Sequence, residues 1–332
     1  MPDYRHIIEE RERQTLSPYA ALSAETRGRE YPIDPCPVRT AFVRDRDRII
    51  HCKSFRRLKH KTQVFLSPVG DHYRTRLTHT LEVAQIARTI ARGLLLNEDL
   101  TEAIAMGHDL GHTPFGHSGE SVLNRIVPGG FEHNKQSLRI VEKLENGKGL
   151  NLTFEVRDGI LNHKKSGHPS TLEGVVVSLA DRIAYVNHDI DDAVRAGLLS
   201  NDILPKSCIE AIGATHGERI NTLVLDILQT SSGKNHVEMS GEISSEFEKL
   251  RQFLFDNLYH DSAAKAEEGK AEGVIERLYY HYLKHVIELP PEFTKYIDED
   301  GPDRIAADYI ACMTDRYAVR DYTRLFVPAD WA

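Results

Sequence analysis

Apolar residues recur at the helical period along most of this chain, and this pattern restricts the folds that it can adopt. Between residues 172 and 190 the apolar positions are mostly three or four residues apart, which is typical of a helix with one buried face. The residues on this face are Val175, Val176, Leu179, Ile183, Val186 and Ile190. Similar spacing predicts helices at 77–96, 101–110, 244–260, 265–288 and 303–319. We therefore expect an all-α fold, a helical bundle with at most a small β-hairpin.

Shorter signals predict how these helices begin and how they are connected. Residues 62–76 interrupt the helical period around Pro-Val-Gly-Asp, which favours a small hairpin or loop. Ser170–Glu173 and Thr215–Glu218 both have the pattern of a capping box at a helix start. The polar stretch 263–273 is a candidate for a mobile connection. We expect an N-terminal arm at 1–38, irregular over residues 23–40, and then a single domain at 39–332 that ends in a helical extension.

Charge and composition narrow the classes of function. The chain has 332 residues and a formal net charge of −8, which argues against a generally basic surface for nucleic acid. Residues 1–80 nevertheless carry 16 basic and 10 acidic residues, which fits either a face for an anionic ligand or a solvated mixed-charge region. No apolar run approaches the ~20 residues that cross a bilayer, and the N-terminus lacks a signal-peptide pattern. We therefore expect a cytoplasmic protein that does not associate with membranes.

Four residues are candidate ligands for a divalent metal ion, namely His79, His108, Asp109 and Asp181. Imidazole and carboxylate groups bind Mn, Mg, Fe, Co, Ni or Zn, and four of them leave coordination positions open for water or substrate. A single histidine on an apolar helix is more often a hydrogen-bonded core residue. Asp181 is more informative, because it lies within an apolar helical stretch where a buried charge must be paired or bound to a metal. Packed helices can direct all four side chains into one cavity.

The segment GHDLGHTPFGHSGE (107–120) combines four glycines with three histidines and a glutamate. Its glycines permit a tight loop and a close approach of the backbone to a ligand. His117 and Glu120 are three residues apart, so they share a face if this part is helical. A carboxylate that accepts a hydrogen bond from an imidazole fixes its tautomer and raises its pKa, which suits general acid–base catalysis. This pair is therefore the candidate acid–base pair.

These motifs resemble those of the HD-domain metal-dependent phosphohydrolases. The neighbouring sequence resembles, more specifically, the short bacterial form of the deoxyguanosine triphosphate triphosphohydrolase family. The similar stretches are RTAFVRDRDRIIHCKSFRRLKHKTQVF (39–65), YRTRLTHTLEVAQIARTIA (73–91), GHDLGHTPFGHSGE (107–120), FEHNKQSLRIV (131–141), SLADRIAYVNHDIDDA (178–193) and DYIACMTDRYA (308–318). The resemblance implies an HD-domain helical bundle that hydrolyses deoxynucleoside triphosphates at the α-phosphate, releasing the deoxynucleoside and triphosphate. It also implies a homo-oligomer, with a hexamer as one form.

The resemblance assigns roles to particular residues. The metal ligands would be His79, His108, Asp109 and Asp181, and the catalytic pair His117 and Glu120. The substrate-binding residues would be Gln63, Arg76, His112, His133, Asn134, Lys164, Tyr185 and Asp189. Three of these keep a simpler alternative: Arg76 as the partner of a surface carboxylate, Lys164 as part of a solvated loop, and Tyr185 as a core residue.

Two other classes of function remain open from the sequence. An HD-domain 5′-nucleotidase or cyclic-nucleotide phosphodiesterase would explain the metal ligands, but not the similarity around Gln63, Arg76 and Tyr185. A nucleotide-sensing or single-strand-binding module would need neither His117 nor Glu120. Nucleic-acid binding has no support in the sequence, because the chain lacks the helical insertions of the longest family members.

Overall fold

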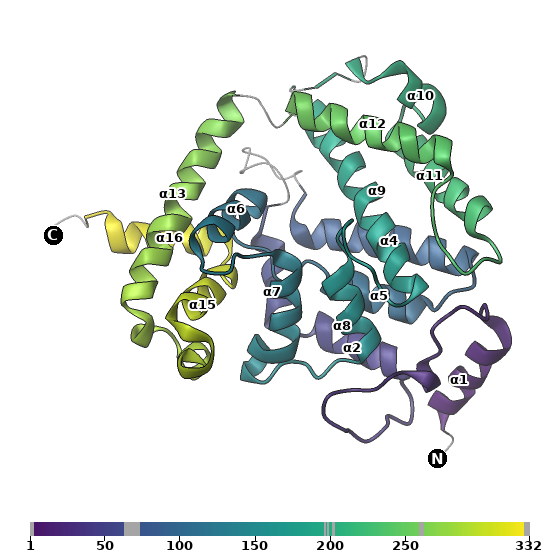
Figure 1. The fold of residues 1–332 in the computed structure, drawn as a ribbon, viewed down its shortest axis with the longest axis horizontal. Helices are drawn as coiled ribbons and strands as arrows, with labels where there is room; N and C mark the ends of the chain where they lie inside the picture. The colour runs from purple at the N-terminus through teal and green to yellow at the C-terminus, as the bar shows by residue number, and fades with distance from the viewer. Residues whose placement is uncertain are drawn as a thin grey trace. The chain divides into compact units, whose positions relative to one another are not determined.

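The computed structural model describes residues 3–62, 74–195, 197, 199–200, 203–258 and 262–328. Helices dominate this part of the chain (Figure 1). Within it, the β-structure consists of two isolated antiparallel bridges, one between Arg29 and Thr153 and one between Thr62 and Thr75. The predicted all-α fold is therefore confirmed.

The chain divides into two compact units, and neither is continuous in sequence. The first unit comprises residues 1–50, 79–108 and 151–261. The second unit comprises residues 51–78, 109–150 and 262–332. One of the boundaries falls between His108 and Asp109, so the two predicted ligands of the HD dipeptide belong to different units.

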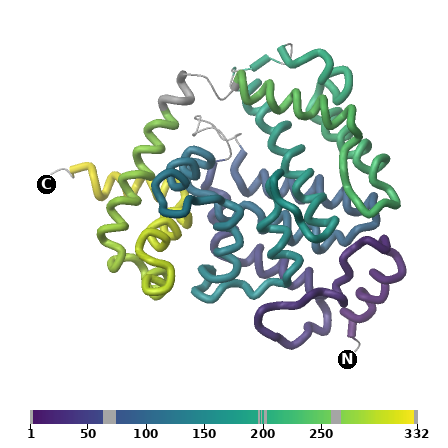
Figure 2. The backbone as a smooth tube through the Cα atoms, in the orientation of Figure 1, coloured from purple at the N-terminus to yellow at the C-terminus, as the bar shows by residue number. Residues whose placement is uncertain are grey.

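The first unit is built around a short buried helix, α5, which contacts α2, α8 and α9 from distant parts of the sequence (Figure 2). Asn97 caps α5, since its side-chain oxygen accepts hydrogen bonds from the backbone of Asp99 and Leu100. The helices of this unit are α1 (Tyr4–Thr15), η1 (Ser23–Glu25), α2 (Ala41–Ile50), α4 (Arg76–Gly93, whose first residues belong to the second unit), α5 (Glu98–Gly107), α8 (Phe154–Asn162), α9 (Leu172–Arg195), α10 (Lys206–Ile212), α11 (His216–Ser231) and α12 (Gly241–Leu258).

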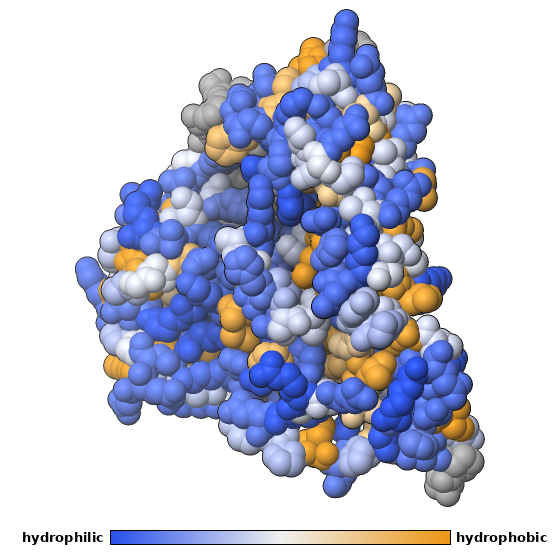
Figure 3. Space-filling model, turned by 45° about the vertical axis from the view of Figure 1, so that its right-hand side comes forward, coloured by the Kyte–Doolittle hydropathy of each residue, from blue (hydrophilic) through white to orange (hydrophobic). Residues whose placement is uncertain are grey.

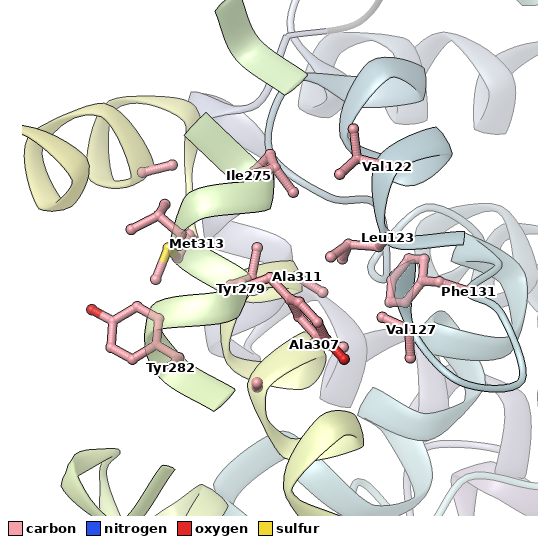
Figure 4. Close-up of a cluster of buried hydrophobic side chains, with 14 of the residues drawn as sticks. Val122, Leu123, Val127, Phe131, Ile275, Tyr279, Tyr282, Ala307, Ala311 and Met313 are labelled. Atoms are coloured by element: carbon pink, nitrogen blue, oxygen red, sulfur yellow. The ribbon is translucent and has the colours of Figure 1, made fainter. Parts of the chain in front are cut away.

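The second unit has its own hydrophobic core, in which α6 packs on α13 and α13 packs on α15. Figure 4 shows Leu123 and Phe131 directed towards Tyr279 of α13 and Ala311 of α15. Its helices are α3 (Lys53–Arg57), η2 (Leu58–His60), α6 (Gly116–Ile126), α7 (His133–Arg139), η3 (Ile140–Leu144), η4 (Glu145–Gly147), α13 (Ser262–Lys284), η6 (Val286–Glu288), α14 (Pro291–Thr294), α15 (Ile297–Ala311) and α16 (Asp315–Phe326).

One of the two predicted capping boxes is confirmed and the other is wrong. Thr215 and Glu218 form the capping box of α11. Before α9, Thr171 Oγ1 accepts the hydrogen bond from Gly174. The carboxylate of Glu173 instead accepts hydrogen bonds from the backbone N–H groups of Ala21 and Asn97, at 3.0 and 2.9 Å. Complete burial of Glu173 explains the difference, because it brings the carboxylate to backbone groups far away in the sequence.

The predicted connection at 263–273 is also wrong, because these residues belong to α13. Alanine, glutamate and lysine dominate this stretch, and all three favour helices. The predicted hairpin at 62–76 is described only at its ends, which the bridge between Thr62 and Thr75 joins. The predicted helix at 303–319 is two helices, α15 and α16, with a break after Ala311.

Among the described residues, no helix has both the length and the apolar character needed to cross a membrane. On the face drawn in Figure 3, hydrophobic residues form small groups separated by hydrophilic ones. Scattered hydrophobic residues of this kind are normal on protein surfaces.

Candidate active site

Three of the predicted metal ligands meet within the first unit. His79 comes from α4, His108 directly follows α5, and Asp181 lies in α9. Asp181 Oδ1 lies 3.0 Å from His79 Nε2 and 3.7 Å from His108 Nε2. The possible ligand atoms of the three residues all lie within 4.8 Å of one another. Both imidazoles are buried, whereas the Asp181 side chain keeps 20% of its surface exposed.

The end of α5 determines which nitrogen of His108 faces this cluster. Nδ1 of His108 lies 2.7 Å from the carbonyl oxygen of Ala105 in the last turn of the helix. A carbonyl only accepts, so Nδ1 carries the proton and Nε2 presents its lone pair towards Asp181. Gly107 lets α5 approach α8 at this point, because a Cβ atom there would lie 2.5 Å from the side chain of Ile160.

This cluster fits a divalent metal ion. Nitrogen and oxygen ligands bind such ions at about 2.1 Å, so two ligands of one ion at right angles are about 3.0 Å apart and tetrahedral ones about 3.4 Å apart. The separations of 3.0 and 3.7 Å are close to these values. Burial disfavours the charged form of Asp181. In the metal-free site, imidazoles of His108 and His79 that carry a proton towards Asp181 outweigh this effect and hold the pKa of the carboxyl well below its usual range, and a metal ion would take the place of those protons. Two imidazoles and one ionised carboxylate therefore converge.

The fourth predicted ligand, Asp109, lies in a second cluster, within the second unit. Its Oδ2 accepts a hydrogen bond from the buried Arg76 at 2.8 Å, and its Oδ1 lies 3.4 Å from His112 Nε2. Asp109, His112 and His133 also have their possible ligand atoms within 4.8 Å of one another. Because Asp109 follows His108 in the sequence, a peptide bond joins the two clusters.

Glu120 is the second carboxylate of this cluster, and it contacts the histidines His133 and His117. Its carboxylate oxygens both lie 2.9 Å from His133 Nδ1, and it also accepts a hydrogen bond from the backbone N–H of His133. His117 shares the start of α6 with Glu120, as the spacing predicts, but its Nδ1 lies 3.8 Å from the carboxylate. Burial alone would raise the pKa of Glu120, but His117 and His133 outweigh it and lower the pKa. The carboxylate is therefore ionised and anchored mainly on His133.

The two other histidines of this cluster differ in exposure. The side chain of His117 is 75% exposed. The buried ring of His112 stacks on that of His133, with ring centres 4.0 Å apart. Burial, together with the positive charge of Arg76, lowers the pKa of His112 well below its usual value. His112 is therefore a neutral hydrogen-bonding group near pH 7, whereas His117 is in contact with solvent.

Glycine and lysine residues hold the loop that carries these histidines. A Cβ atom at Gly111 would lie 2.2 Å from the backbone nitrogen of Ser137, so only glycine fits between the loop and α7. The ammonium group of the buried Lys61 donates hydrogen bonds to the carbonyl oxygens of His112 and Ala311. Burial lowers the pKa of Lys61 to about 8. The loop is thus fixed from two sides.

The remaining predicted substrate-binding residues lie in three places. Tyr185 and Asp189 follow Asp181 at one and two turns of α9; Tyr185 is half-buried and Asp189 is buried. Burial raises the pKa of Tyr185 to about 12. The buried Asn134 lies beside His133 in α7, and Lys164 is half-buried in the segment after α8. Gln63 lies outside the described residues.

A group of three cations in the first unit surrounds Glu248 and was not among the predicted site residues. Glu248 of α12 accepts hydrogen bonds from Arg182, which follows Asp181, and from Arg251 at 2.9 Å. Lys165 Nζ lies 3.0 Å from the same carboxylate. Glu248 therefore holds three cations together on this part of the first unit. Their sequence spacing offers no signal, because they come from three separate segments.

Two residues that were not predicted from the sequence lie behind His79: His188 contacts its ring, and Glu82 contacts His188. His188 Nδ1 lies 3.4 Å from His79 Nδ1, and His188 Nε2 lies 2.9 Å from the carboxylate of Glu82. Helical spacing could have indicated both, because Glu82 follows His79 by three positions in α4 and His188 follows Asp181 by seven in α9.

Two family models match this chain. The HD-domain model matches residues 76–186, and the phosphohydrolase-associated domain model matches residues 237–324. A solved phosphohydrolase structure from Bacteroides thetaiotaomicron has a TM-score of 0.54 over 84% of this chain and 68% of its own, at 16% identity, which is a likeness of fold alone.

Relatives with much higher identity carry one shared name. A deoxyguanosinetriphosphate triphosphohydrolase-like protein of Caldanaerobacter subterraneus subsp. tengcongensis is 60% identical over 98% of this chain and 97% of its own length. Proteins of the same name from Clostridium perfringens and Desulfatibacillum aliphaticivorans are 52% and 48% identical, each over 98% of both chains. This similarity runs through both units and through the HD segment that carries His79, His108 and Asp181, and so the chain belongs to the deoxyguanosinetriphosphate triphosphohydrolase-like family of HD-domain proteins.

Proposed function

We propose that this protein hydrolyses deoxynucleoside triphosphates at the α-phosphorus, with a divalent metal ion, to give the deoxynucleoside and intact triphosphate. The observation that carries the proposal is the convergence of His79 and His108 on the ionised carboxylate of Asp181. The names of the relatives support the choice of a deoxynucleoside triphosphate as substrate.

His79, His108 and Asp181 would hold the metal ion. Asp109, which follows His108 in the sequence, would be the fourth ligand. A metal ion in such a site, whether Mn, Mg, Fe, Co, Ni or Zn, polarises a phosphoryl oxygen and lowers the pKa of water. Two neutral imidazoles and two carboxylates leave the filled site uncharged for a divalent ion, so added phosphate charge is not repelled.

The second cluster would handle the proton of the reaction. His117 is exposed and therefore free to reach a bound nucleotide, where it would transfer a proton at the 5′ oxygen. Glu120 would stabilise the charge on the neighbouring imidazoles, because its carboxylate stays ionised. The neutral His112 and the adjacent His133 and Asn134 would donate hydrogen bonds to the phosphate oxygens.

Positive charge and an aromatic ring would hold the rest of the nucleotide. Arg76 and Lys164 are proposed to contact the triphosphate, Arg76 while keeping Asp109 in place. Tyr185 would pack against the sugar, where a 2′-hydroxyl would be crowded, and Asp189 together with Gln63 would bind the 3′-hydroxyl. This arrangement would favour deoxyribose over ribose.

Product analysis tests the proposal directly. The protein is incubated with each of the four deoxynucleoside triphosphates and with Mn²⁺ or Mg²⁺, and the products are separated by ion-exchange chromatography. We expect deoxynucleoside and tripolyphosphate in equal amounts, and turnover reduced by about 10³-fold or more in the Asp181→Asn variant. Monophosphate with pyrophosphate would place the cleavage elsewhere. Turnover of monophosphates or cyclic nucleotides alone would support the other HD-domain activities, and binding without turnover would support a sensing role.

A further inference from the structure

The second ring nitrogen of His79 needs a hydrogen-bond acceptor before the first can bind a metal ion. A neutral imidazole carries one proton, so a ring that binds through Nε2 keeps its proton on Nδ1 and donates it to a neighbour. In His108 that neighbour is the carbonyl of Ala105. In His79, Nδ1 instead faces Nδ1 of His188, at 3.4 Å.

Glu82 determines which of these two nitrogens carries the proton. A contact between two ring nitrogens is a hydrogen bond only when one is protonated and the other is not. Nε2 of His188 lies 2.9 Å from Glu82 Oε2, and an ionised carboxylate only accepts. The proton of a neutral His188 therefore belongs on Nε2, and its Nδ1 is an acceptor for the Nδ1–H of His79.

The four residues that take part come from one face of each of two helices. His79 and Glu82 are one turn apart in α4, and Asp181 and His188 are two turns apart in α9. His188 is 1% exposed, and its ring meets that of His79 edge-on with centres 5.5 Å apart. His216 stacks on the ring of His188, with centres 6.2 Å apart. The orientation of His188 is therefore constrained by its neighbours.

We propose that His188, oriented by Glu82, is a positioning residue that sets the tautomer of His79 and thereby its affinity for the metal ion. The inference rests on the proposed function, because it requires that His79 binds a divalent ion. With its proton on Nδ1, the lone pair of His79 Nε2 faces Asp181 Oδ1 at 3.0 Å. Two acceptors at this distance repel each other unless a cation lies between them. The contact with His188 thus favours the metal-loaded site over the empty one.

Three variants separate the parts of this contact. His188→Phe keeps a ring of similar size and removes both nitrogens. His188→Asn places an amide oxygen close to the position of Nδ1, so that an acceptor for His79 remains. Glu82→Gln keeps the shape of the side chain and removes its charge. His216→Phe is the matched control, because it changes the other imidazole that stacks on His188.

The measurement is the dissociation constant for Mn²⁺ alone, from electron paramagnetic resonance titration of the full-length protein, with the melting temperature in chelator as the check on folding. We expect His188→Phe to bind Mn²⁺ about 10–100-fold more weakly, as is usual when the hydrogen-bond partner of a metal ligand is lost. His188→Asn should recover a large part of this affinity, Glu82→Gln should lose a few-fold, and His216→Phe should match the wild type. At saturating Mn²⁺, the kcat of His188→Asn should approach that of the wild type.

The outcomes distinguish this inference from the proposed function. A wild-type protein that binds no Mn²⁺ would overturn the proposed metal site itself. Tight binding by the wild type and equal binding by a folded His188→Phe would overturn only the role of His188. If His188→Phe does not fold, Glu82→Gln decides the matter, because that side chain is 38% exposed and tolerates the change. Unchanged Mn²⁺ affinity in Glu82→Gln would then reject the inference.

Discussion

The two histidine clusters of this protein use the same residue types in opposite ways. In the first unit, His108 donates its ring proton to the backbone, so that its other nitrogen faces the carboxylate of Asp181 as an acceptor. In the second unit, His133 directs its ring nitrogen to the carboxylate of Glu120 at 2.9 Å, as a donor. The first arrangement calls for a cation between its members, whereas the contact between His133 and Glu120 is a hydrogen bond that needs none. Composition alone does not separate the proposed metal site from the proposed acid–base pair.

The largest expected effect is the loss of a member of the first cluster. Asp181→Asn replaces an anionic ligand with a neutral amide, and Lewis-acid stabilisation is worth several kcal/mol. We expect kcat/KM for deoxynucleoside triphosphates to fall by about 10³-fold or more, since each 1.36 kcal/mol is tenfold. Metal analysis of the purified variant should show the ion lost as well. Full activity with metal retained would contradict the role of Asp181 as a metal ligand.

A smaller loss is expected from the proposed acid–base pair, His117 and Glu120, without any loss of metal affinity. His117→Ala removes a proposed proton-transfer group, and such groups contribute about 10²–10⁴-fold to the rate. Glu120→Gln removes the charge that the neighbouring histidines face. We expect kcat to fall by about 10²-fold in each variant while Mn²⁺ affinity in titrations stays at the wild-type value. Parallel loss of metal binding would show that the clusters act as one ligand set.

The sugar contact should have a weaker effect, on selectivity rather than on rate. If Tyr185 excludes the 2′-hydroxyl, Tyr185→Ala should lower the preference for a deoxynucleotide over the matching ribonucleotide by about tenfold, which is within the ~1–3 kcal/mol typical of apolar contacts. Competition between the two nucleotides in one reaction measures this ratio. Tyr185→Phe serves as the control and should keep the preference. An unchanged ratio in Tyr185→Ala would make the residue part of the core.

The smallest effect on catalysis is expected at Glu173, which lies in the same helix as Asp181. Burial raises the pKa of Glu173 to about 7, and hydrogen bonds from Asn97 and Ala21 only partly oppose this. Because the folded-state pKa lies above the ordinary value of 4.5, the folded protein holds more protons than the unfolded chain between pH ~4.5 and ~7. The stabilising contribution is therefore complete below that range and is lost as the pH rises through about 7.

Glu173→Gln tests whether the titration of Glu173 makes the stability of the protein depend on pH. The amide oxygen can still accept the hydrogen bonds from Ala21 and Asn97, and it does not titrate. Between pH 5 and pH 8 we expect the wild type to lose on the order of 3 kcal/mol relative to the variant, at 1.36 kcal/mol per unit of pKa. Urea unfolding at both pH values gives the two free energies of unfolding. A constant difference between the proteins would mean that Glu173 is ionised at both pH values.

Much of the fold was predictable because helical periodicity depends on local spacing. The residues that converge on Asp181 were also predictable, since a carboxylate in an apolar stripe requires a partner. The hydrogen-bond partners of these residues were less accessible. The carbonyl of Ala105 has no side-chain signature, and Glu173 followed the capping-box pattern while its carboxylate bonds to Asn97. Such contacts depend on tertiary packing, which overrides local preference.

Gln63 shows a different limit, because the sequence indicated the residue but the described part of the chain does not include it. For residues 263–273, polarity suggested a connection, whereas the strong helix-forming composition gave the correct answer.

The backbone partner of His108 has a consequence for how this protein tolerates mutational drift. The carbonyl of residue 105 is present whatever amino acid occupies that position, so no single side-chain substitution there deletes its oxygen. The corresponding partner of His79 is an imidazole that one codon change can remove. Random variation should therefore affect the two proposed ligands unequally, because His79 can lose its partner through a substitution at His188, whereas His108 keeps its partner whatever residue occupies position 105.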